Sequence, residues 1–289
     1  MRVIDVNALT KDYGSGRGVF DVSFHVDQGE VFGFLGPNGA GKSTTIRHLM
    51  GFSKPDSGST LIFGKDSFDR YSEILSRVGY IPGEIALPAG LTGWEFLHMM
   101  QSLQHNKNDA LLKKLIALFE LDPSGDTKRM SLGVKRKLAV VTAFMNDPEV
   151  LILDEPTAGL DPKQRISIRN YISRIAFNKI VIIATHVVSD IEFIARDIIM
   201  LKKGVIVDNA PPHELTKKIE GKVWNVPCPE SEVQSMQDKF RVTNIARDDE
   251  SGNVSLRVLS AEKPSEDSKI VTPTLEDYYL YVFGDTITV

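Results

Sequence analysis

A run of nine residues carries the clearest chemistry in the sequence. Its residues are Gly36, Pro37, Asn38, Gly39, Ala40, Gly41, Lys42, Ser43 and Thr44. They fit the pattern G-x-x-x-x-G-K-[ST], between the apolar segment Val31–Leu35 and a helical segment. Glycines let backbone N–H groups surround phosphates, Lys42 can reach the β and γ phosphates, and the Ser43 hydroxyl can ligate Mg²⁺. We therefore predict a nucleoside triphosphate site.

Two carboxylates follow the apolar segment at residues 150–153. They are Asp154 and Glu155, and neighbouring side chains on a strand point in different directions. Asp154 can hold Mg²⁺, while Glu155 can orient and deprotonate an attacking water as general base. The alternative is a pair of solvated acids at a strand end. The phosphate loop in the same chain favours the catalytic interpretation.

A histidine ends the next apolar segment. Residues 180–185 form that segment and His186 follows it, at the sheet edge where α/β proteins bind ligands. A lone histidine is usually structural. Its place one strand beyond the acidic pair favours a contact with the γ-phosphate.

The surrounding pattern predicts an α/β core. Residues 3–10 and 19–26 are predicted strands of an antiparallel layer, separated by a turn at 13–16, and residues 19–26 alternate between apolar and polar. Residues 91–144 carry helix formers at helical spacing. Strands and helices then alternate, with helices expected at 162–176 and near 189–196. Beyond the Pro211-Pro212 pair, four short segments (VWNVPCP, VQSMQDKF, RVTNIARDD and VSLRVLS) suggest a small α/β appendage, and Leu275–Phe283 could be a closing helix.

The totals bound the class of protein. The chain has 289 residues with a net charge of -4, which gives no global reason to bind nucleic acid. The single cysteine, Cys228, fits a reducing cytosol, the start lacks the features of a secretion signal, and the apolar runs are strand-sized. We expect one large domain at 1–219, with a helical subdomain at about 84–147, and a small accessory domain at 220–289.

The order of these motifs resembles that of the nucleotide-binding subunits of ABC transporters, from Val3 to about Leu215. The segment 130–138, MSLGVKRKL, is similar to the family signature L-S-G-G-Q and closes a helical insertion. Ser131 is also an N-cap candidate for the following helix, which is the plainer interpretation. The resemblance implies an α/β P-loop NTPase core of ABC type, with an N-terminal antiparallel β layer, an inserted α-helical subdomain and a C-terminal α/β appendage.

The resemblance also implies site roles. Ser131 and Gly133 would bind the γ-phosphate of ATP held by a second copy, and Asp161 would belong to a loop that crosses the dimer interface. Tyr13 would stack on adenine, although it could equally pack a turn. Two positions depart from the family pattern: Leu132 replaces a signature glycine, and Gly83 replaces a glutamine that contacts metal and couples to the membrane partner, with Glu84 as a possible substitute.

Two further segments, GLTGWEFL and PTLEDYYLYVF, resemble an exporter subfamily with an ABC-2 type permease. The tail could equally be a docking helix for the appendage. The expected function is an ATPase, with ATP and Mg²⁺ as cofactors, that dimerises and drives export through a separate permease at the cytoplasmic face of the membrane. The alternatives are a soluble ABC ATPase acting on DNA or ribosomes, and a regulatory subunit with little hydrolysis.

Overall fold

The computed structural model describes residues 2–103, 107–247 and 253–284, and the chain divides into two compact units. The first is Met1–Asn209 and the second is Ala210–Val289. The division falls ten residues before the expected boundary at 219/220, because α7 (Pro212–Lys217) packs against α9 (Leu275–Phe283).

The first unit begins with an antiparallel sheet of strand order β2-β1-β4-β5. Its strands are β1 (Arg2–Asp12), β2 (Gly18–Asp27), β4 (Ser57–Ile62) and β5 (Lys65–Asp66). Along β2, Val22, Phe24 and Val26 are buried while the residues between them are exposed. This alternation puts one face of the sheet in the core.

A second sheet has the order β10-β9-β3-β8-β7-β6 and is parallel from β9 to β6. Its strands are β3 (Val31–Leu35), β6 (Val78–Ile81), β7 (Val150–Asp154), β8 (Ile180–Thr185), β9 (Asp197–Lys202) and β10 (Val205–Ala210). Every residue of β3, β7 and β8 is buried, as expected for strands covered on both faces. The carboxyl ends of these strands share one edge, where the site residues follow.

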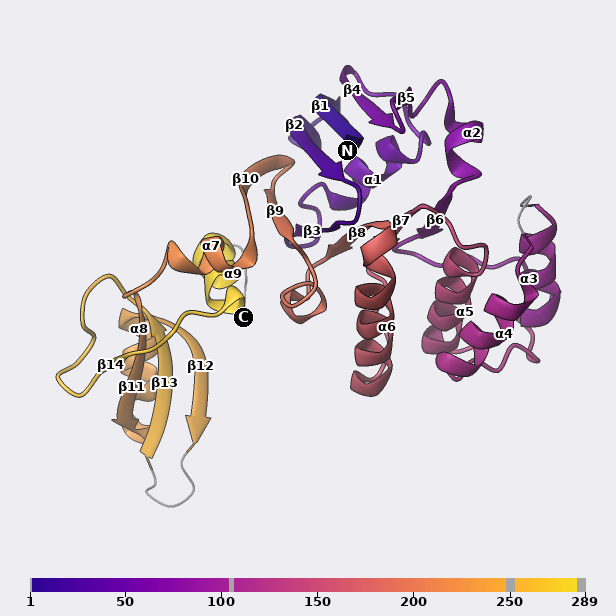
Figure 1. The fold of residues 1–289 in the computed structure, drawn as a ribbon. Helices are drawn as coiled ribbons and strands as arrows, with labels where there is room; N and C mark the ends of the chain where they lie inside the picture. The colour runs from indigo at the N-terminus through magenta and orange to yellow at the C-terminus, as the bar shows by residue number, and fades with distance from the viewer. Residues whose placement is uncertain (1, 104–106, 248–252, 285–289) are drawn as a thin grey trace. The chain divides into compact units, whose positions relative to one another are not determined.

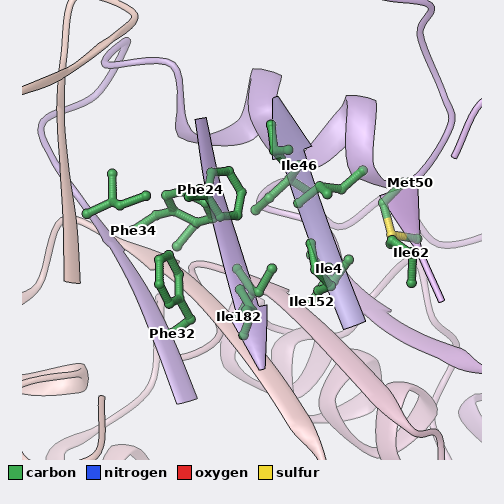
Figure 2. Close-up of a cluster of buried hydrophobic side chains, with 14 of the residues drawn as sticks. Ile4, Phe24, Phe32, Phe34, Ile46, Met50, Ile62, Ile152 and Ile182 are labelled. Carbon is green, nitrogen blue, oxygen red and sulfur yellow. The ribbon is translucent and has the colours of Figure 1, made fainter. Parts of the chain in front are cut away.

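The main core fills the space between the two sheets and α1 (Lys42–Leu49). Figure 2 shows side chains from both sheets and from α1 pointing toward one another. Phe24 of β2 contacts Phe32 and Phe34 of β3, with ring centroids 5.5 and 5.1 Å apart. Other labelled members are Ile4, Ile46, Met50, Ile62, Ile152 and Ile182. This packing fixes α1, and with it the loop that precedes α1.

Helices cover the other face of the parallel sheet, where α5 and α6 lie opposite the antiparallel sheet (Figure 1). The helices of the first unit are α2 (Tyr71–Leu75), α3 (Gly93–Ser102), α4 (Asp109–Leu118), α5 (Leu132–Phe144) and α6 (Pro162–Ile175), with the 3₁₀ turn η1 (Ala176–Asn178). Side chains of Thr92, Asn108 and Ser131 accept from backbone N–H groups at the starts of α3, α4 and α5. The expected helical insertion is therefore present.

The prediction of a helix near 189–196 is wrong. That segment holds the 3₁₀ turn η2 (Val188–Asp190) followed by further turns. Its β-branched and aromatic residues are weak helix formers, and Phe193 leaves 76% of its surface exposed. The carboxylate of Asp190 accepts from two threonine hydroxyls, which holds the turn.

The second unit contains a sheet of order β12-β13-β11-β14. Its elements are β11 (Val223–Pro229), η3 (Glu230–Glu232), α8 (Val233–Lys239), β12 (Arg241–Arg247), β13 (Asn253–Leu259) and β14 (Lys269–Ile270), besides α7 and α9. A small core of Trp224, Val226, Leu256 and Val258 packs against residues of α8. The last two residues of the expected segment 241–249 lie outside the described residues. Across the described ranges, every helix is too short or too polar to span a membrane.

Candidate functional site

In the run Gly36–Thr44, the first six residues form the loop between β3 and α1 and the last three begin α1. Gly41 at the end of the loop has φ 110°, a left-handed conformation that favours glycine, and lies against Gly204. A Cβ on Gly36 would approach the carbonyl oxygen of Leu201 to 2.4 Å, so only glycine fits there. The loop is thus held close to β9 and the turn after it.

Lys42, the first residue of α1, turns back onto the loop. Its Nζ donates to the carbonyl oxygens of Gly36 at 2.6 Å and Pro37 at 3.2 Å. The same Nζ lies 3.9 Å from Glu155 Oε1. Burial lowers the pKa of Lys42, although the carboxylates of Glu155 and Asp154 oppose this shift. A buried ammonium among backbone carbonyls is ready to accept a stronger anionic partner.

Asp154 ends β7 inside the site and is 3% exposed. The Ser43 hydroxyl bonds to its carboxylate, yet Oδ1 is buried with no hydrogen-bond partner among the residues that the structure describes. Burial raises the pKa of Asp154, opposed by the hydrogen bond from Ser43. A buried carboxylate oxygen without a partner, beside a hydroxyl, fits Mg²⁺, which is bound through one or two carboxylates together with ligand phosphates and waters.

Glu155 and His186 meet at the ends of two adjacent strands. Asp154 of β7 pairs with Ala184 of β8, and the Glu155 N–H donates to the Ala184 carbonyl at 2.8 Å. The Glu155 Oε1 lies 2.8 Å from His186 Nδ1, and its Oε2 lies 3.3 Å from Thr185 Oγ1. Glu155 has φ 51°, an uncommon conformation for a residue with a side chain. The carboxylate is thus held at the edge of the cleft.

A cleft of about 460 Å³ gathers most of the predicted site residues. Lys42, Ser43, Asp154 and Glu155 line this cleft, and so does Tyr13, which is 47% exposed. Arg17 and Lys203 also line the cleft and were missed by sequence reasoning. Lys203 belongs to the tight turn between β9 and β10. The basic residues of this turn are the one sequence feature that could have pointed to Lys203.

Gly83, which follows β6, lines the same cleft. A Cβ added there would lie 3.1 Å from Asp154 Oδ2, so the loop backbone passes close to this carboxylate. Glu84 is exposed and is not among the lining residues. The buried Arg136 of α5 donates to the carbonyl oxygens of Pro82 at 3.0 Å and Gly83 at 2.9 Å. The Arg136 guanidinium therefore ties α5 to this loop.

Comparison with known proteins decides the family. The family model for "ABC transporter" matches residues 19–158. The chain is 31% identical to the uncharacterized ABC transporter ATP-binding protein YhcH of Bacillus subtilis, over 98% of this chain and 97% of that protein. This chain belongs to the ABC transporter ATP-binding proteins. It is also 36% identical to a Nod factor export ATP-binding protein of Burkholderia pseudomallei, over 72% of this chain and 71% of that protein.

The solved structures agree with the predicted fold. An ATP-binding subunit of an ABC transporter matches with a TM-score of 0.68 and 27% identity, over 75% of this chain and 92% of that chain. The predicted ABC-type α/β fold is confirmed, and so is the enzyme class, an ABC-type ATPase. The chain is therefore an ATP-binding subunit of an ABC transporter.

Six predicted site residues of this ABC protein are not among the residues that line its own cleft. Gly36 and Pro37 accept from Lys42, and His186 lies against Glu155, so these three stay next to the cleft. The other three are Ser131, Gly133 and Asp161. Ser131 caps α5, and Asp161 caps α6 through Oδ1, which accepts from Gln164 N at 2.8 Å. A Cβ on Gly133 would lie 3.1 Å from the Gly159 carbonyl oxygen, so the starts of the two helices are close together. Leu132 packs over Gly159 and is 58% exposed. These residues form a separate group, named the signature face below.

Proposed function

We propose that two copies of this ABC ATPase close around two ATP–Mg²⁺ molecules and drive export through a separate membrane permease. One observation carries the proposal. Lys42, Asp154 and Glu155 line a single cleft together with Tyr13, Asp154 Oδ1 has no hydrogen-bond partner in the described part of the chain, and His186 lies against Glu155.

In the proposed reaction, each side chain has one task. Lys42 exchanges its loop carbonyls for the β and γ phosphates, and Ser43 and Asp154 hold Mg²⁺. Bound Mg²⁺ neutralises phosphate charge. Glu155 orients the attacking water and accepts its proton, while His186 fixes Oε1 of Glu155 and faces the γ-phosphate. Tyr13 stacks on the adenine ring.

The signature face supports a dimer. Ser131, Gly133 and Asp161 carry the roles that the family resemblance implies, yet none of them lines the cleft of its own chain. The start of a helix with free backbone N–H groups attracts anions. We place the signature face of one copy against the ATP bound by the other, which completes the site and excludes water.

The membrane partner follows from the family and its relatives. The Nod factor relative is named as an export protein, and the segments GLTGWEFL and PTLEDYYLYVF resemble subunits that work with ABC-2 type permeases. We therefore propose an ABC-2 type permease as partner and a peripheral position on the cytoplasmic face of the membrane.

Co-purification tests the proposal. Tagged Glu155→Gln protein is isolated from detergent-solubilised native membranes with ATP and Mg²⁺, and accompanying chains are identified by mass spectrometry. We expect a multi-spanning permease. Recovery of soluble partners alone would contradict the transporter proposal and favour an ATPase that acts without a permease.

A further inference from the structure

Asp190 forms a buried cluster behind the catalytic edge of the sheet. It lies in the turn η2, four residues after His186, and is 5% exposed. Its Oδ2 accepts from Thr157 Oγ1 at 2.5 Å and from Thr185 Oγ1 at 3.4 Å. Both threonines are buried, at 4% and 0% exposed. One carboxylate oxygen of η2 therefore contacts both the segment that follows β7 and the end of β8.

These segments are the ones that carry the two proposed reacting groups. Thr157 lies two residues after Glu155, and Thr185 directly precedes His186. The Thr185 hydroxyl also lies 3.3 Å from Glu155 Oε2, and it accepts the N–H of Val187 at 3.0 Å. Asp190 thus touches both flanks of the Glu155–His186 pair without touching either residue of the pair.

We propose that Asp190 is a positioning residue for ATP hydrolysis, which holds Glu155 and His186 in register through the hydroxyls of Thr157 and Thr185. The inference rests on the proposed role of Glu155 as general base. It assigns to Asp190 a part in the turnover step and none in ATP binding, because Asp190 is absent from the lining of the nucleotide cleft.

The geometry of Glu155 explains why such a hub is needed. Its left-handed backbone persists only where surrounding bonds over-determine it. A general base must lie within hydrogen-bond reach of its water, and a displacement of about 1 Å costs about a hundredfold in rate. Two hydroxyls bonded to one buried carboxylate restrain the segments on both sides of the base.

The choice of a carboxylate also fits this role. Burial raises the pKa of Asp190, and the hydrogen bond from Thr157 opposes the shift. A buried carboxylate is expensive unless it is well bonded. Of the charged groups near it, Arg165 favours its ionised form and Glu155 opposes it. Hydrogen bonds to an ionised carboxylate are stronger than those between neutral groups, and here they offset the cost of burial and hold the bonded segments rigidly.

Steady-state ATPase measurements on the full chain test the inference. Asp190→Ala should lower kcat about a hundredfold and leave KM for ATP within about threefold, because the phosphate loop is intact. Asp190→Asn keeps the volume and an acceptor oxygen, so its kcat should stay within about tenfold of wild type. If Asp190 were purely structural, Asp190→Ala would lower the melting temperature and leave kcat per folded molecule unchanged. That result would overturn the inference.

Threonine variants test whether Asp190 acts through the hydroxyls of Thr157 and Thr185. Thr157→Val and Thr185→Val remove the hydroxyls at constant shape and should reproduce the loss of kcat, whereas Thr157→Ser and Thr185→Ser should restore it. Thr127→Val is the matched control, since Thr127 is equally buried and donates to Pro88 O in the helical subdomain. It should lower stability without changing kcat. Full kcat in the Val variants at 157 and 185 would overturn the proposed route.

The same assay separates this inference from the proposal beneath it. Glu155→Gln is measured in parallel. An inactive Glu155→Gln with a fully active Asp190→Ala would refute the role of Asp190 alone, whereas an active Glu155→Gln would refute the general-base assignment itself.

Discussion

At the scale of single residues, Lys42 shows how the site is prepared for phosphate. Its ammonium is 6% exposed and bonds to two carbonyl oxygens of its own loop. These carbonyls carry only partial charge, so a triphosphate offers a much stronger partner in the same place. Burial lowers the pKa of Lys42, and the nearby carboxylates of Glu155 and Asp154 oppose this shift because they favour the charged ammonium.

Lys42→Ala should weaken ATP binding at least about tenfold and abolish hydrolysis, because the β and γ phosphates lose their cation. Isothermal titration calorimetry and a phosphate-release assay measure the two effects. Lys179→Ala is the control: Lys179 is also largely buried and donates to Pro148 O, but it precedes β8, at the strand end away from the site. Wild-type turnover by Lys42→Ala would refute the site.

The sequence predicted those residues whose function depends on neighbours along the chain. The phosphate loop, the acidic pair and His186 all follow apolar strands, and the structure brings them to one edge. Asp190 and Arg136 escaped prediction because their partners lie far away in sequence, as in the bond from Arg136 to Gly83. Pattern alone does not show which distant backbone a buried charge will meet.

At the scale of elements, the cap of α5 has two separable effects. Ser131 Oγ accepts from Val134 N at the long distance of 3.4 Å, whereas Thr92 forms a full capping box with Glu95 at the start of α3. Ser131→Ala should therefore reduce the free energy of unfolding by only about 0.5 kcal/mol, and Thr92→Ala by about 1 kcal/mol.

Ser131→Ala, which costs less stability than Thr92→Ala, should cost more ATPase activity. If Ser131 contacts ATP in a partner copy, Ser131→Ala loses most of its ATPase activity while Thr92→Ala keeps it. Urea denaturation and steady-state hydrolysis give both numbers for each variant. Equal activities would remove the phosphate role of Ser131 and leave it an ordinary helix cap.

The closing helix α9 offers a pH-dependent prediction. Burial acts to raise the pKa of Asp277, but hydrogen bonds from Arg257 and Thr274 outweigh it and the pKa of Asp277 falls below its usual value. A lowered carboxyl pKa stabilises the folded state above the unfolded pKa of about 3.9, and the gain is lost as pH falls through the folded value.

Asp277→Asn should therefore destabilise the second unit by about 2 kcal/mol at pH 7, since it removes the carboxylate that accepts two hydrogen bonds from Arg257. The difference from wild type should shrink below about pH 4. Urea denaturation followed by fluorescence of Trp224, in a Trp94→Phe background, reports on this unit because the chain has two tryptophans. A difference that is independent of pH would exclude the ion pair as its cause.

Helices were predicted most accurately where apolar residues recur at helical spacing over several turns. The expected closing helix matches α9, and the helix expected at 162–176 matches α6 within a residue. The helix expected near 189–196 failed because tertiary bonds of Asp190 hold a turn there, against a segment of weak helix formers. Local propensity could not reveal those bonds.

At the scale of the whole molecule, an ABC core and a second compact unit share one chain. From the sequence we expected the boundary at 219/220. The structure groups α7 with α9, across more than fifty residues of intervening sheet, and so moves the division to Ala210. Packing between distant segments decided this, and no local signal carried it.

We propose that Glu155 is the general base of an ATPase that works as a dimer closed around ATP. Loss of a general base costs about a hundredfold or more in rate. Glu149→Gln is the control, since Glu149 precedes β7, at the strand end away from the site, and pairs with the exposed Arg77.

Gel filtration of Glu155→Gln with ATP and Mg²⁺, with hydrolysis assayed on the same sample, tests this claim most directly. We predict a dimer that retains ATP and turns over at about a hundredth of the wild-type rate or less, while Glu149→Gln behaves as wild type. A Glu155→Gln protein that stays monomeric and hydrolyses ATP normally would contradict the account.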